Sequence, residues 1–161
     1  MSGNSNKTAK TDKTAKTLIV YYSRSGKSEV IAKDLQTKTG WDTDKIEYAD
    51  KNKVSFLGAG YEATLRKTTK IKGAVHTPGK YDRIIFITPV WAGRMSTPVR
   101  SYMVENRADI KSYSLIATCG GSAIDGAVKD AFDAVRKEPA VSERYLSKDI
   151  DNKKYDLAKF M

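Results

Sequence analysis

The sequence predicts an α/β protein built on a doubly wound parallel sheet of five strands, arranged in three layers. Short apolar runs alternate along the chain with segments of helical periodicity, which gives the order βαβ(α)βαβαβ. The apolar runs are continuous, as strands are when helices cover both faces of a sheet. The chain has 161 residues and is 40% hydrophobic, which is enough to fill the core of one domain.

The first strand and the first helix have clear signals. Leu18 to Tyr22 is an unbroken apolar run with β-branched and aromatic residues, typical of a buried strand. A helix is predicted from about Gly26 to Thr39, and Gly40 follows in the position where glycine commonly ends a helix. The apolar residues that share one face of this helix are Val30, Ile31 and Leu35.

The signals weaken after the first helix, and residues 51–80 are the least legible part of the sequence. Ile46 and Tyr48 alternate with charged residues, which predicts a short edge strand with one wetter face. Helical periodicity is only hinted at over residues 59–69. His76 is predicted to be a surface loop residue.

The signal returns in the second half of the chain. Ile84 to Ile87 is the most hydrophobic run and predicts a central strand, followed by a loop. Thr97 is then expected to cap a helix that has Pro98 in its first turn. Leu115 to Ala117 predicts a further buried strand.

The C-terminal part completes the alternation. A helix is predicted over residues 124–135 and is expected to be closed by Pro139. Residues 141–146 predict a last short strand, and residues 151–160 leave room for a short final helix. The apolar stripe of the longer helix consists of Ile124, Ala127, Val128, Ala131, Phe132 and Val135.

Cysteine and histidine counts exclude some classes of protein. One cysteine, Cys119, cannot form an internal disulfide, and with one histidine it cannot supply the usual ligands of a zinc site, so no metal is expected. We expect Cys119 to be a small buried residue. No apolar stretch approaches the roughly 20 residues of a membrane span or forms a secretory signal, so we expect a cytoplasmic protein with no membrane partner.

The charge is strongly basic. Lysine and arginine number 29 against 19 acidic residues, a formal net charge of +10, which favours anionic ligands and partners. Residues 1–16 are polar and lysine-rich, and we expect a disordered basic arm followed by a domain over residues 17–161. The arm has no aromatic or arginine side chain, so nucleic-acid binding is not expected.

In a doubly wound sheet, ligands bind beyond the carboxyl ends of the strands where the strand order reverses. The loops after the first, third and fourth strands therefore supply the candidate binding residues, and no catalytic residue is singled out. The first loop contributes Ser23, Arg24, Ser25, Gly26, Lys27 and Ser28. The third-strand loop contributes Thr88, Pro89, Val90, Trp91, Ala92, Gly93 and Arg94. The fourth-strand loop contributes Thr118, Cys119, Gly120 and Gly121.

The first loop predicts a phosphate site. It joins a buried strand to a helix start and offers three hydroxyl groups beside backbone N–H donors, which together with the helix dipole favour an anion. The alternative is that its serines only cap the helix. A P-loop is not expected, because that motif needs a glycine where Tyr21 stands.

The other two loops predict a flat ligand. Trp91 is placed to cover an aromatic ring, and Ala92 and Gly93 leave the backbone open to close approach. The alternative is that Trp91 closes the core. The fourth-strand loop is also small and open at Gly120 and Gly121.

These segments resemble the flavodoxin family. Residues 18–35 are similar to its first strand, phosphate loop and helix, with Ser23, Ser25, Gly26 and Ser28 meeting a T-x-T-G-x-T type pattern. Residues 81–103 are similar to its flavin loop. The resemblance implies a flavodoxin-like sheet with strand order 2-1-3-4-5 and a bound flavin mononucleotide (FMN), its phosphate at residues 23–28 and its ring between the loops of Trp91 and Cys119.

The resemblance implies an FMN-binding electron-transfer protein as the leading function. Two alternatives stay open: an NAD(P)H-dependent flavin or quinone oxidoreductase of the same fold, and a flavin-free interaction domain on this scaffold. Flavodoxins are strongly acidic, whereas this chain carries +10. The expected partner is therefore a redox protein with an acidic docking face.

Overall fold

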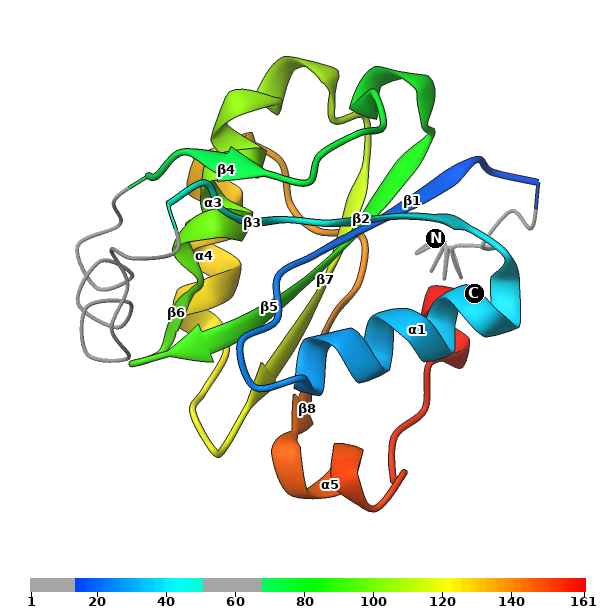
Figure 1. The fold of residues 1–161 in the computed structure, drawn as a ribbon, viewed down its shortest axis with the longest axis vertical. Coiled ribbons are helices and arrows are strands. Elements are labelled where there is room, and N and C mark those ends of the chain that lie inside the picture. Colours follow the sequence, from blue (N-terminus) through cyan, green and yellow to red (C-terminus); the bar gives the residue numbers. More distant parts are fainter. Residues whose placement is uncertain (1–13, 51–67) are drawn as a thin grey trace, which may run out of the picture.

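The computed structural model describes residues 14–50 and 68–161 and contains a five-stranded parallel sheet (Figure 1). From one edge to the other the strands are β2 (Asp42–Lys45), β1 (Thr17–Tyr21), β5 (Arg83–Trp91), β7 (Tyr113–Cys119) and β8 (Ser142–Leu146). All four neighbouring pairs are parallel. Counted among these five strands, the order is 2-1-3-4-5, as predicted.

Helices cover both faces of the sheet, as the three-layer prediction requires (Figure 1). On one face lie α1 (Lys27–Thr39), α5 (Ser147–Asp151) and a 3₁₀ turn at Ala158–Phe160. On the other lie α3 (Thr97–Glu105) and α4 (Asp125–Val135). Within residues 14–50 and 68–161, no helix is long and apolar enough to cross a membrane.

The central strands are buried on both faces because each face packs against a helical layer. All five residues of β1 and all seven of β7 are buried. Side chains alternate along a strand, so Leu18 and Val20 enter the core cluster under α3 and α4, while Ile19 enters the cluster under α1 and α5. This double burial explains why the apolar runs predicted these strands.

The fold also contains two small antiparallel pairs of strands. β3 (Glu47–Tyr48) pairs with β4 (Ile71–Lys72) in a separate two-stranded sheet. β6 (Arg94–Met95) folds back on the end of β5 as a hairpin. Two further 3₁₀ turns lie in connections: Pro78–Lys80 between β4 and β5, and Arg107–Asp109 between α3 and β7.

The edge strand was predicted at the wrong residues. The parallel edge strand is β2, with Asp42 opposite Leu18 and Lys45 opposite Tyr21, and Tyr48 belongs instead to β3. β2 reads Asp-Thr-Asp-Lys, which has no apolar alternation. The two carboxylates of β2 bind residues from other segments of the fold. Polar residues can therefore form this strand, although no sequence pattern predicts it.

Three details of the helices differ from expectation. Val30 is 46% exposed, because only part of the predicted α1 face meets the sheet. Ser96, not Thr97, is the N-cap of α3, and Thr97 is its first residue. α4 ends at Val135, where Arg136 takes a left-handed conformation (φ 64°) and its N–H donates to Phe132, so Pro139 does not close the helix.

The C-terminal segment also differs. The single short helix predicted within residues 151–160 is replaced by α5, which ends at Asp151, and the 3₁₀ turn at Ala158–Phe160. The helical hint at residues 59–69 falls largely outside the described residues, as do residues 1–13 of the predicted arm. At Lys16, the backbone N–H already donates to the Asp82 carboxylate over 2.8 Å.

The tyrosines predict a loss of stability at high pH. Burial, with a hydrogen bond to Asp42, raises the pKa of Tyr81 to about 12, and burial raises the pKa of Tyr145 to about 12. Burial also raises the pKa of Tyr102 and Tyr113. A raised pKa means that the folded chain keeps protons that the unfolded chain loses near 10, so this stability is full below pH 10 and is lost toward pH 12 and above.

The check is a titration of tyrosinate absorbance in the near ultraviolet, with the native and the denatured chain in parallel. These four tyrosines are expected to stay protonated in the native chain at pH values where the denatured chain has ionised. Complete ionisation of the native chain near pH 10, without unfolding, would contradict the burial argument.

Candidate functional site

The loops after β1, β5 and β7 lie at the same edge of the sheet, because the carboxyl ends of parallel strands meet there (Figure 1). Side chains connect them. Ser28 Oγ and Thr118 Oγ1 lie 2.8 Å apart and join the first loop to the end of β7. The rings of Tyr22 and Trp91 meet edge to face at 5.9 Å and join the first loop to the end of β5. The structure therefore brings together the three segments that the sequence singled out.

The first loop ends on the N-terminus of α1. Gly26 is the N-cap, with φ 89°, a left-handed conformation that favours glycine. Ser23 Oγ accepts a hydrogen bond from the Glu29 N–H over 3.2 Å, so Ser23 does cap part of the first turn. The N–H groups of Lys27 and Ser28 also lie in this turn, where a helix offers them no acceptor.

The remaining side chains of this loop divide into two groups. Arg24 and Ser25 are exposed at the turn itself. Lys27 forms an ion pair with Asp151 of α5, and Ser28 is buried against Thr118. Of the three serines in this loop, Ser25 is therefore the exposed one.

The segment after the third parallel strand is largely not a loop. β5 continues through Trp91, and only Ala92 and Gly93 form the turn to β6. Both have positive φ, 50° and 74°, the combination of a two-residue type I′ hairpin. The sequence missed this hairpin because alanine is an uncommon residue at positive φ.

The base of the hairpin is held by hydroxyl groups. Thr88 is buried, and its Oγ1 lies 2.9 Å from Ser96 Oγ and accepts from the Ser96 N–H over 3.0 Å. Pro89 is half-buried and Val90 is buried in the core. The Thr88 hydroxyl therefore has its hydrogen-bond partners within the protein.

Trp91 is half-buried at the end of β5 and packs against the core cluster that contains Tyr22. Tyr22 in turn meets Tyr48 edge to face at 5.6 Å. The indole is therefore in contact with Tyr22 while part of the side chain stays accessible, and Trp91 as a ring-covering residue stays a prediction.

Arg94 lies on β6 and points toward α4. Its guanidinium donates to Asp130 Oδ1 over 2.9 Å, and the Asp130 side chain is fully buried whereas that of Arg94 is 27% exposed. Arg94 thus serves the protein as the cation of a partly buried ion pair.

The loop after β7 has small side chains and is anchored at its base. Thr118 and Cys119 are buried, as predicted for the cysteine, while Gly120 and Gly121 are exposed. The Cys119 thiol donates to the Ser122 carbonyl at 3.4 Å.

These loops fit a phosphorylated, flat ligand in two respects. At Gly26, Gly93, Gly120 and Gly121, an added Cβ would meet no atom within 4 Å, so the backbone borders open space at each loop. The donors available to a phosphate are the N–H groups of Lys27 and Ser28 together with the exposed Ser25 hydroxyl. The residues present therefore match the donor set that a phosphate ester needs.

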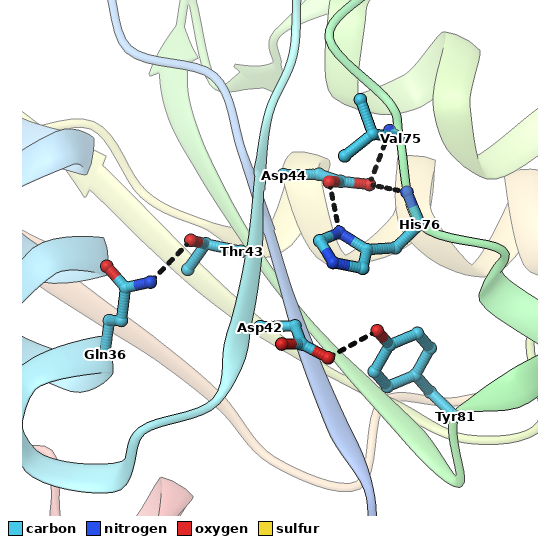
Figure 2. Close-up of polar contacts among 7 residues, drawn as sticks. All are labelled: Gln36, Asp42, Thr43, Asp44, Val75, His76 and Tyr81. Atoms are coloured by element: carbon cyan, nitrogen blue, oxygen red, sulfur yellow. Dashed lines mark hydrogen bonds and ion pairs between the residues drawn. The ribbon is translucent and has the colours of Figure 1, made fainter.

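His76 lies in a loop and its side chain is 33% exposed, as predicted in part, but it also binds a buried carboxylate. Its Nδ1 lies 2.6 Å from Asp44 Oδ1, and the backbone N–H groups of Val75 and His76 donate to Asp44 Oδ2 over 3.2 and 3.1 Å (Figure 2). Asp44 is buried on β2, and the neighbouring Asp42 accepts from the Tyr81 hydroxyl over 2.6 Å (Figure 2). The cluster fastens the segment before β5 to the edge strand.

Two residues of α4 also belong to the site and were missed. Gly126 lies against the backbone of Gly93, and Asp130 binds Arg94. A glycine inside the helical pattern is a signal of close packing, but the sequence gives no indication of which segment packs there.

A hollow of about 380 Å³ lies elsewhere, between α4 and the start of β8. Val128 and Phe132 line it beside Ser142. The sequence placed Phe132 on the buried stripe of its helix, whereas it is 37% exposed.

Solved structures of flavoproteins share this fold. A flavoprotein from Lactobacillus acidophilus NCFM in complex with FMN superposes with a TM-score of 0.72 at 18% identity, over 86% of this chain and 97% of that one. The apo-form of the flavoprotein from the same organism gives 0.63 at 19% identity, over 85% and 95%. A flavodoxin from the domain Archaea gives 0.50 at 17% identity, over 86% and 91%.

Sequence comparison adds nothing to the structural likeness. No protein-family model matches the chain. No curated protein matches it either. The likeness is therefore one of architecture, and it confirms the predicted fold class: this chain has a flavodoxin-like α/β fold.

Proposed function

We propose that this chain binds FMN non-covalently and acts as an electron-transfer flavoprotein. The observation that carries the proposal is the meeting of three loops at the carboxyl edge of the sheet, one of which ends on the N-terminus of α1. A ligand with an anionic end and a flat ring matches the donors and the open backbone found there. The FMN complex with the same architecture supports the choice of flavin.

Each part of the site has a role in this proposal. The first-turn N–H groups of α1 and the Ser25 hydroxyl hold the phosphate. Trp91 covers one side of the ring, and the backbones of Ala92, Gly93, Gly120 and Gly121 border it. FMN, when bound, supplies the capacity to take up and release electrons.

The basic charge supports an acidic redox partner. A net charge of +10 attracts a negatively charged surface and raises the rate of encounter, an effect that salt screens. The rate of electron exchange with an acidic carrier protein should therefore fall as ionic strength rises. A rate that is indifferent to salt would remove this part of the proposal.

The proposal predicts that FMN binds more tightly than riboflavin. A hydrogen bond to a charged group contributes about 1.5–3 kcal/mol, so even one phosphate contact corresponds to about tenfold or more in affinity. The visible absorption spectrum of the purified protein, recorded before and after addition of FMN or riboflavin, measures the binding. Equal affinity for the two flavins would contradict a phosphate site at α1.

Replacing Ser25 with alanine separates the phosphate from the ring. The variant should weaken FMN by about tenfold, the value of one charge-assisted bond, and leave riboflavin unchanged. Ser112→Ala is a matched control, because Ser112 is also an exposed serine but precedes β7 at the opposite edge of the sheet. If Ser25→Ala and Ser112→Ala bind FMN alike, Ser25 does not contact the phosphate.

A further inference from the structure

We propose that Gly126 and Asp130 of α4 are positioning residues that fix the Ala92–Gly93 hairpin, and with it the ring side of the flavin site. The inference rests on the proposed function, because it gives the hairpin the task of bordering the ring. Contacts at the tip of the hairpin, at its second strand β6 and at its base support the inference.

The tip of the hairpin lies against Gly126. A Cβ at Gly126 would stand 2.3 Å from the Gly93 carbonyl oxygen and 3.3 Å from the Gly93 carbonyl carbon. Both are backbone atoms, so any side chain here requires the hairpin to move. Gly126 is in the first turn of α4, whose positive end attracts the negative end of a carbonyl dipole.

The second strand of the hairpin, β6, is held by a residue one turn further along α4. Asp130 follows Gly126 by four residues, which places both on one face of α4. Its fully buried carboxylate accepts from the Arg94 guanidinium over 2.9 Å. The Gly126 contact and the ion pair therefore reach two consecutive residues of the hairpin, Gly93 and Arg94.

The hairpin itself carries strain that these contacts sustain. Ala92 has φ 50°, a left-handed conformation that is unfavourable for a non-glycine residue. Such conformations persist where the surrounding structure determines them. At the base, Thr88 and Ser96 close the hairpin through their hydroxyls. Contacts within the protein therefore determine the conformation of the hairpin without a ligand.

The experiment measures FMN affinity and the reduction midpoint potential of bound FMN in Gly126→Ala and Asp130→Asn. Matched controls are Gly79→Ala, where a Cβ makes only ordinary contacts of 3.6 Å, and Asp133→Asn, whose carboxylate pairs with Lys129 on the surface of α4. Both site variants should weaken FMN at least about tenfold, and the controls should match the wild type.

The potential distinguishes positioning from loss of structure. It changes only when oxidised and reduced FMN lose different amounts of affinity, as expected for a displaced contact with the redox-active ring. Gly126→Ala alters no charge, so a shifted potential in that variant reports the hairpin itself. Ser25→Ala, which touches only the phosphate, should lower affinity and leave the potential unchanged.

If circular dichroism shows that either site variant fails to fold, Arg94→Lys replaces that variant, because lysine keeps the charge but loses the guanidinium geometry. Arg94→Lys should weaken FMN binding and shift the potential of bound FMN.

Wild-type protein that does not bind FMN refutes the proposed function. Wild-type protein that binds FMN, with folded variants of unchanged affinity, overturns the positioning roles alone. So does weakened binding at an unchanged potential.

Discussion

Replacing Asp44 with alanine is expected to lower the free energy of unfolding by about 3 kcal/mol. The Asp44 carboxylate is fully buried and accepts from two backbone N–H groups and contacts His76 Nδ1 (Figure 2). Its loss leaves these donors without their acceptor, and the segment before β5 loses its attachment to the edge strand. Urea denaturation followed by circular dichroism measures the change.

Asp42→Ala is the matched control for this prediction. Asp42 is an exposed aspartate of the same strand whose carboxylate accepts from the Tyr81 hydroxyl. Its replacement should cost about 1 kcal/mol or less. If the two variants are equally stable, the Asp44 cluster does not hold the edge of the sheet.

Arg94→Glu is expected to be the most damaging change at the site. It removes the guanidinium that pairs with the fully buried Asp130 carboxylate and places a negative charge beside that carboxylate. Removing one partner of a buried ion pair costs about 3–5 kcal/mol, and because Arg94 is 27% exposed the lower end applies. Denaturant titration of the flavin-free protein measures the loss.

Lys129→Glu reverses a charge that α4 carries at its surface. Lys129 is 61% exposed and pairs with Asp133, so its reversal should cost about 0.5 kcal/mol. A similar loss in Arg94→Glu and Lys129→Glu would show that Asp130 does not depend on Arg94.

The sheet could be predicted from sequence because its central strands are buried on both faces. Burial of this kind leaves continuous apolar runs, such as residues 84–87, that few other structures require. The candidate phosphate loop could be identified for a similar reason. A strand, a short loop with Gly26 and a helix start follow one another directly in the chain, so the local sequence contains all of its residues.

The remaining features depend on contacts between distant segments. β2 is a polar strand whose Asp44 is satisfied by His76, 32 residues later. The hairpin at Ala92 takes a conformation that alanine disfavours, and its contacts with Gly126 and Asp130 come from a different layer of the fold. Local propensity cannot report such partners, because each residue is ordinary until the fold brings the other one to it.

The most direct test of FMN binding at this edge of the sheet is a titration of the isotope-labelled protein with FMN, followed by amide resonances. We expect saturable shifts that are largest at residues 25–28, 92–93 and 120–121. Unchanged resonances at these residues, or shifts confined to Val128 and Phe132 in the hollow between α4 and β8, would contradict the account.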